Sequence, residues 1–169
     1  MRMLHWVVAA ALAVGACTVN PVPQGYTGPT ARIVDSAWPH GASRADIFYL
    51  AKVNGQPIDE SLTATAIANR GRGFYQKPVA IGRDVPASEA NFTVVGRTRY
   101  AAPIIELTHT VYQVSGEIKF TPLADHSYVV KGMLKPDYSA VWIEDSATGE
   151  LAGPKIEVKG SAAIGFFEK

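Results

Sequence analysis

The side chains that could carry out chemistry are few and lie far apart in the sequence. None of the four histidines is spaced from another in a metal-binding pattern such as H-x-H or H-E-x-x-H. His40 and His109 could form a zinc site only if folding brought them together with an acidic residue, the candidates being Asp35, Asp46 and Glu106. We therefore predict no metal and no other cofactor.

Nucleophilic catalysis has equally little support. It needs a serine or cysteine beside a base, and the sequence contains neither a G-x-S-x-G nor an S-x-x-K motif. The single cysteine, Cys17, is better explained as a site of lipid attachment, as argued below. Our first hypothesis is a noncatalytic protein without catalytic residues. The alternative is a glycan- or peptide-processing hydrolase whose site is assembled from distant residues.

Residues 69–77, with the sequence NRGRGFYQK, form the most unusual local segment. Backbone amides freed by glycine, the guanidinium groups of Arg70 and Arg72, and the rings of Phe74 and Tyr75 could bind an anionic or sugar ligand. The interpretation that we favour is a solvated loop with Phe74 or Tyr75 packed into the core. As the other possibility, we take these four side chains as candidate contacts for a ligand or partner.

Two tryptophans and three arginines complete the set of candidates. Trp38 is flanked by proline and glycine, which favours a loop where its ring could contact a partner. Trp142 lies within a strand-like segment and is predicted to be in the core, since a buried aromatic ring is commoner there than an exposed one. A basic patch could also include the arginines Arg83, Arg97 and Arg99 if they share a face.

The N-terminus carries the clearest signal. Arg2 precedes an apolar run over residues 6–14, which is shorter than the ~20 residues of a membrane-spanning helix. Residues 14–17, VGAC, resemble the lipobox of bacterial lipoproteins: an aliphatic residue, two small residues and a cysteine whose thiol accepts diacylglycerol. The resemblance implies signal-peptide cleavage between Ala16 and Cys17 and lipidation of Cys17. An ordinary secretory peptide cleaved after Ala16 is the alternative.

The lipobox resemblance also predicts the location and the parts of the chain. Two or three acyl chains would hold Cys17 permanently in a bilayer, because each buried methylene contributes ~0.8 kcal/mol. Thr18 stands where inner-membrane lipoproteins often carry Asp, which implies the outer membrane, and we expect the chain to face the periplasm. We predict a signal peptide over residues 1–16, the lipidated cysteine with a flexible Pro- and Gly-rich tether over 17–29, and one domain over 30–169.

Charge and cysteine content exclude some classes of protein. The chain has 16 basic and 15 acidic residues, and Arg2 is the only charged residue before Cys17, so the processed chain is balanced. Such a balance argues against a nucleic-acid binder or a polybasic membrane binder, whose affinity needs a surplus of cations. A lone cysteine cannot form an internal disulfide, so the fold must depend on packing.

Hydrophobic alternation predicts an all-β domain. Residues 111–121 alternate apolar and polar side chains, as do 91–98 and 156–159, whereas residues 47–53 are apolar on both faces, as in a central strand. Further strands are expected over residues 31–35, 78–81, 128–134 and 141–143. We predict a single antiparallel β-sandwich of immunoglobulin-like or transthyretin-like topology with about seven to nine strands.

Turn and capping residues refine this prediction. Asn54-Gly55 and residues 147–149 mark hairpin turns. A short helix is predicted over residues 59–69, capped by Asp59 or Ser61 and stopped by Gly71, although two threonines within it leave a loop as the alternative.

The order of these features resembles that of uncharacterised proteobacterial outer-membrane lipoproteins with a small PEGA-like β-sandwich. The similarity rests on turn motifs: the segments are residues 31–34, FYLAKVNG at 48–55, VPA at 85–87, FTV at 92–94, FTP at 120–122, YVV at 128–130, and WIED and TGE at 142–150. Because these motifs are turn residues, the resemblance implies the architecture far more than the function. We predict a membrane-anchored, noncatalytic envelope lipoprotein that binds a protein partner or a peptidoglycan or lipopolysaccharide component, and no nucleic acid. The resemblance implies no catalytic residues.

Overall fold

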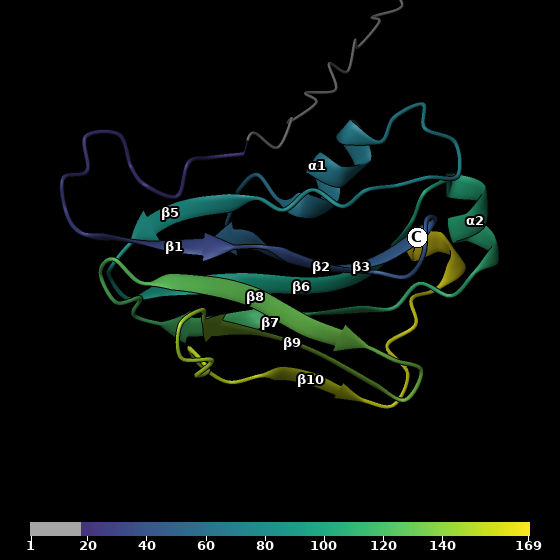
Figure 1. Cartoon of the computed structure of the whole chain (residues 1–169). Helices are drawn as coiled ribbons and strands as arrows, with labels where there is room; N and C mark the ends of the chain where they lie inside the picture. The colour runs from purple at the N-terminus through teal and green to yellow at the C-terminus, as the bar shows by residue number, and fades with distance from the viewer. Residues whose placement is uncertain (1–17) are drawn as a thin grey trace, which may run out of the picture.

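The chain folds into two open β-sheets packed face to face, as the computed structural model shows over the described residues 18–169 (Figure 1). The elements are β1 (Thr30–Val34), β2 (Ser36–Pro39), β3 (Arg44–Val53), β4 (Gln56–Pro57), α1 (Ser61–Ala68), β5 (Gly82–Pro86), β6 (Ala90–Tyr100), α2 (Pro103–Thr108), β7 (Gln113–Phe120), β8 (Ser127–Leu134), β9 (Tyr138–Asp145), β10 (Ile156–Lys159) and a short 3₁₀ turn (Phe166–Glu168).

The strands divide into two sheets of five. Sheet A has the order β10-β9-β8-β1-β5, and sheet B has the order β2-β3-β6-β7, with β4 paired to the far end of β3. The mostly β, sandwich-like prediction is therefore confirmed. The fully antiparallel prediction is wrong in one place, because β1 pairs in parallel with β8 over Tyr128 and its two neighbours. The short strands β2 and β4 raise the count in the described residues above the expected range.

The main core lies between the two sheets, where the inward-facing residues of both meet. Its largest fully buried members include Phe92, Leu50 and Ile118 from sheet B and Ile33 and Ile143 from sheet A. Each such side chain contributes about 1.5–3 kcal/mol when removed from water. The alternation predicted for 111–121 places Val114 and Ile118 in this core, as expected.

The outer face of sheet B is also covered, and this explains why β3 is apolar on both faces. Ile47, Tyr49 and Val95 form a second buried cluster, against which Leu62 of α1 packs. The helix predicted over 59–69 is therefore present. Its cap is Glu60, whose carboxylate accepts the N–H of Thr63 at 3.0 Å, rather than Asp59 or Ser61.

Other boundaries differ from the sequence-based expectation. The strand expected over 78–81 begins instead at Gly82. The sequence does not predict α2, because Pro103 at its first position is the one residue there that is typical of a helix start. The first described residues of the expected tether are bonded to the domain: Thr18 Oγ1 donates to Asp59 at 2.8 Å and the Val19 N–H to the Pro57 carbonyl at 2.9 Å.

A buried carboxylate marks the point where the chain passes from sheet A to sheet B. Asp35 is the single residue between β1 and β2. Its Oδ1 accepts hydrogen bonds from the Leu50 N–H at 3.0 Å and from Arg83 at 2.8 Å, and its Oδ2 accepts from the Ser61 N–H at 3.0 Å and from Arg83 at 2.7 Å. One side chain thus ties together β3, the start of α1 and β5.

We predict that replacing Asp35 with Asn lowers the free energy of unfolding by about 3–5 kcal/mol, because Arg83 would be left buried without its counter-charge. Urea unfolding measures this. The matched control is Asp84→Asn, which breaks the exposed pair with Arg32 and should cost less than ~1 kcal/mol. Equal losses in the two variants would contradict a central role for the Asp35–Arg83 pair.

Candidate functional site

The crossover at Asp35 leaves a gap in sheet A. On one side β8 pairs with β9 along its whole length, but on the other it pairs with β1 only as far as Val129. Beyond that point the chain has moved to sheet B as β2, so among the described residues no strand pairs with the remainder of β8 on this side. The backbone of β8 therefore has an open edge within the sandwich.

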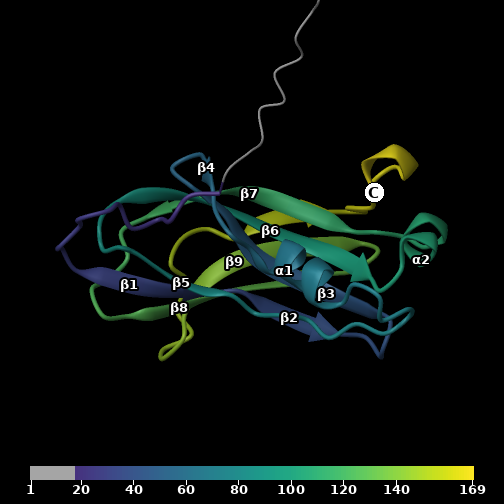
Figure 2. The ribbon, with the colours of Figure 1, turned by 90° about the horizontal axis from the view of Figure 1, so that it is seen from above.

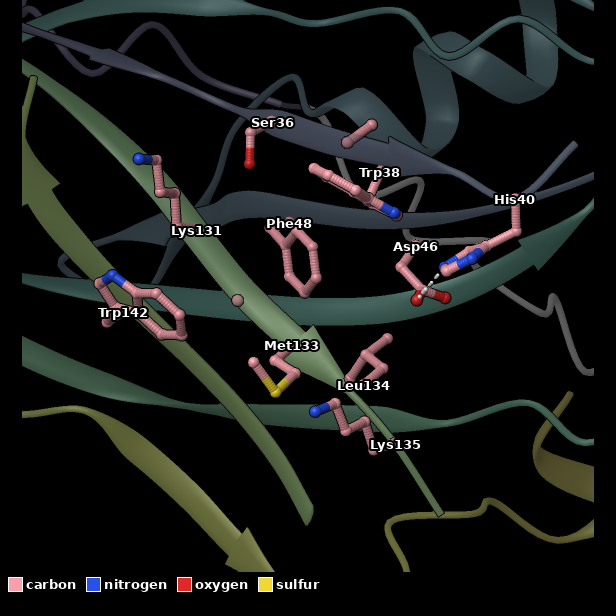
Figure 3. A pocket seen from close by; sticks show the side chains of 12 residues that line it. Ser36, Trp38, His40, Asp46, Phe48, Lys131, Met133, Leu134, Lys135 and Trp142 are labelled. Atoms are coloured by element: carbon pink, nitrogen blue, oxygen red, sulfur yellow. Dashed lines mark hydrogen bonds and ion pairs between the residues drawn. The ribbon is translucent and has the colours of Figure 1, made fainter. Parts of the chain in front are cut away.

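A groove of about 660 Å³ occupies this gap, between β2 and β8 (Figure 3). We call it the β2–β8 groove. Its lining residues come from β2, β3, β8, β9 and the short connections beside them: Ser36, Ala37, Trp38, His40, Asp46, Phe48, Lys131, Gly132, Met133, Leu134, Lys135 and Trp142. Most of the surface is apolar, and the charged side chains lie around it.

Glycine makes the floor of the groove possible. The Phe48 ring points from β3 toward β8 and lies against Gly132 (Figure 3). A Cβ at Gly132 would overlap this ring, and one at Gly96 would lie 2.9 Å from it. The aromatic floor therefore depends on two positions without side chains.

The open edge presents peptide groups to the groove. The His126 carbonyl accepts the Arg32 N–H at 2.9 Å, and the Val130 carbonyl accepts the Ser36 hydroxyl at 2.5 Å. Even-numbered residues of β8 thus direct their backbone groups away from β9. Because these directions alternate with period two along a strand, Gly132 and Leu134 also direct their N–H and C=O groups toward the groove.

Two tryptophans stand at the rim. Trp38 is 68% exposed on β2, so it lies on a strand rather than on the predicted loop. Trp142 is half-buried on β9 and not in the core, because Val141 and Ile143 take the inward positions on either side of it. The Trp142 prediction was therefore wrong, although the candidate contact Trp38 does line the groove.

Hydrogen bonds and charges fix Trp142 in place. Its indole N–H donates to Glu144 at 2.8 Å, and Lys155 Nζ lies 4.3 Å from the ring centroid. Lys131 also contacts Glu144, at 2.6 Å. Burial acts to raise the pKa of Glu144, but the hydrogen bonds from Lys131 and Trp142 outweigh it and hold the pKa below its usual value. The ring is thus held rigidly by a charged carboxylate.

A histidine–aspartate pair closes one end of the groove. His40 Nε2 lies 2.7 Å from Asp46 Oδ2, while Thr98 donates to Asp46 Oδ1 at 2.8 Å. The one hydroxyl among the lining residues, that of Ser36, donates to a backbone carbonyl. Ser36 and His40 are also four positions apart, which corresponds to about 13 Å along an extended chain. No nucleophile and base are therefore brought together in this groove.

The other residues considered for a metal site are dispersed. Asp35 pairs with Arg83, Glu106 lies 3.2 Å from Arg97, and His109 contacts the Ile105 carbonyl at 3.0 Å. Within residues 18–169 no three His, Cys, Asp or Glu side chains come close enough to hold a metal.

A second histidine–aspartate pair has a structural role. His126 Nδ1 lies 2.6 Å from Asp145 Oδ2, and Asp145 Oδ1 accepts the N–H groups of Ala147 and Thr148. The His126 contact and these backbone bonds lower the pKa of Asp145. The pair holds the turn predicted over residues 147–149.

Residues 70–77 form a separate exposed surface, which we call the 70–77 loop. Polar groups fix its ends: Asn69 exchanges hydrogen bonds of 2.8 and 2.9 Å with the backbone of Lys77, and the buried Gln76 bonds to Arg99 and Ala42. Phe74 and Tyr75 are 65% and 52% exposed, so the loop is solvated as expected, but the expected packing of one ring into the core is wrong.

The basic residues do not form one patch. Arg70 and Arg72 are exposed on the 70–77 loop, whereas Arg83 is buried against Asp35 and Arg97 contacts Glu106 and Gln113. Arg83 and Arg97 therefore do not extend a basic patch from the 70–77 loop. Ala16 and Cys17 lie outside the described residues, so the lipidation prediction stays a prediction. Over residues 18–169, no helix has the length and apolar character needed to span a bilayer.

Comparisons of the chain with protein-family models, curated proteins and solved structures find no significant match.

We predict that Gly132→Ala lowers the free energy of unfolding by about 1–3 kcal/mol, because the new methyl group overlaps the Phe48 ring and the Ala140 carbonyl. Chemical unfolding measures the change. In a Phe48→Leu background the same substitution should cost clearly less, since the smaller side chain leaves room. If Gly132→Ala lowers the free energy of unfolding equally in both backgrounds, overlap with the Phe48 ring is not the cause of the loss.

Proposed function

We propose that this chain is a noncatalytic, membrane-anchored envelope lipoprotein whose β-sandwich binds an extended segment of another envelope protein in the β2–β8 groove. The observation that carries the proposal is the open edge of β8 beside an apolar groove, at the place where sheet A lacks a strand. Lipid on Cys17 anchors the protein at the outer membrane, facing the periplasm. The β-sandwich, which has immunoglobulin-like or transthyretin-like topology, is the rigid platform that carries the groove.

The geometry suits an added strand. A segment lying beside β8 would bond to the peptide groups of Gly132 and Leu134, and its alternate side chains would enter the groove over Phe48 and beside Trp38. Main-chain hydrogen bonds then supply affinity for any extended chain, and the apolar floor selects the side chains. A flat partner surface would reach neither feature.

Charge around the groove favours an acidic segment. Lys135 is exposed beside the end of β8 and Lys155 lies over Trp142, whereas Lys131, which also borders the groove, is paired with Glu144. Asp46, the acidic lining residue, is already engaged by His40, Arg44 and Thr98. A segment that alternates apolar and acidic residues would satisfy both the floor and the rim.

The binding function has more support than the hydrolase alternative. The groove is largely apolar, and the one hydroxyl among its lining residues, that of Ser36, donates to the Val130 carbonyl and does not contact the histidine–aspartate pair. A peptidoglycan or lipopolysaccharide component could stack on Trp38, but the open peptide groups of β8 match a polypeptide better.

We predict that an acetylated ten-residue peptide alternating Val and Glu binds the groove and slows hydrogen exchange at the Gly132 and Leu134 amides, measured residue by residue by NMR. Trp38→Ala should weaken binding at least tenfold while leaving the fold intact, because the ring is mostly exposed. Phe167→Ala, which removes a 98% exposed ring elsewhere, is the matched control and should bind as the parent does.

Slower hydrogen exchange only at amides outside the groove would contradict the proposal that a protein segment binds there. Tighter binding of muropeptides or lipopolysaccharide at Trp38 than of any peptide would contradict it as well. A peptide of the same length that alternates Val and Lys tests whether the groove favours acidic segments, and it should bind more weakly than the Val–Glu peptide.

We predict that Cys17→Ala abolishes labelling with radioactive palmitate and moves the protein out of the membrane fraction in the native host, because the acylated thiol is the proposed anchor. Fractionation and labelling of parent and variant measure this. An unlabelled parent, or a variant that fractionates as the parent does, would overturn the lipid anchor and leave the groove to be tested as that of an unanchored protein.

A further inference from the structure

The described chain begins against α1. The Thr18 hydroxyl donates to Asp59, two residues before that helix, and the Val19 N–H donates to the carbonyl of Pro57. Thr18 also lines a hollow of about 340 Å³ together with Thr63, Ala64 and Ile67 of α1. The proposed lipid anchor is therefore attached, one residue earlier in the sequence, to a segment that is bonded beside this helix.

The surface around that point carries two acidic residues, Asp59 and the helix cap Glu60, of which Asp59 accepts the Thr18 hydroxyl, and it also exposes apolar side chains. Ile67 is 57% exposed and Val19 is 42% exposed. Residues 61–83 include four basic residues and no acidic one, and of the four only Arg83 is buried in an ion pair. The exposed cations are Arg70, Arg72 and Lys77, all in the 70–77 loop.

The 70–77 loop lies on the same side of the molecule as α1 and the start of the described chain, whereas β10 lies at the opposite side (Figure 1). Figure 2, turned to look down on that side, shows α1 facing the viewer over β3. The loop is held by Asn69 and Gln76, so neither aromatic ring is needed to pack it. Two exposed rings among three cations are the composition of a bilayer interface, where aromatic rings lie at headgroup level and cations meet anionic lipids.

We propose that the 70–77 loop and the exposed side of α1 rest on the surface of a bilayer that contains anionic phospholipid. This inference rests on the proposed lipid anchor at Cys17. The anchor supplies the affinity, which a charge-balanced chain lacks, and the loop sets the orientation. Three local cations suffice for that role.

Lipidation leaves the chain without a free thiol, because Cys17 is the only cysteine, and this makes a sharp test available. Phe74→Cys introduces a single thiol on the loop, to which an environment-sensitive fluorophore is attached. Leu151→Cys, 48% exposed and bridged to Glu144 of sheet A, is the matched control. Both full-length lipidated proteins are purified from membranes and reconstituted into vesicles of phosphatidylglycerol and phosphatidylcholine, or of phosphatidylcholine alone.

The expected result is a blue shift with a severalfold rise in emission for the probe at 74, largest with phosphatidylglycerol, and no change for the probe at 151. Arg70→Glu with Arg72→Glu should remove the dependence on phosphatidylglycerol. Equal behaviour of the two probes, or a shift at 74 only when a second protein is added, would overturn the inference while leaving the lipid anchor intact. Reaction of the fluorophore with Cys17 in the parent protein would overturn the anchor itself, and the inference with it.

Discussion

The carboxylate of Asp35 is the constraint on which the rest of the arrangement depends. A chain that leaves one sheet for the other in the middle of a sandwich exposes backbone donors that a continuing strand would have bonded. Here one side chain takes the place of that strand, accepting from the Leu50 N–H, the first amide of α1 and both ends of the Arg83 guanidinium. The crossover that creates the β2–β8 groove is thus stabilised because Asp35 bonds to two buried backbone N–H groups and to both terminal nitrogens of Arg83.

Much of the architecture could be predicted from local pattern. Alternation at 111–121 and 156–159, the two-sided apolar run of β3 and the Asn54-Gly55 turn all report local geometry, which the sequence encodes directly. The parallel pairing of β1 with β8 and the Asp35–Arg83 pair could not be predicted in this way. Each joins residues far apart in the chain, so only the folded arrangement determines them.

The candidate site shows the same division. The proline and glycine beside Trp38 indicate that its ring is accessible, but its place on β2 and its partners across the groove depend on the crossover. The frequency with which aromatic rings are buried predicts Trp142 in the core, whereas strict alternation with Val141 and Ile143 predicts the opposite face, where it lies. Gly132 carried no signal at all, because its importance comes from the Phe48 ring that packs against it.

The 70–77 loop can tolerate substitution because its conformation is held from its ends. Asn69 and Gln76 hold its ends through bonds to the backbone, and the side chains between them contribute nothing to that framework. Substitutions at Arg70, Arg72, Phe74 or Tyr75 are therefore close to neutral for folding. The side chains at the tip can therefore change in size and charge while the groove and the crossover keep their structure.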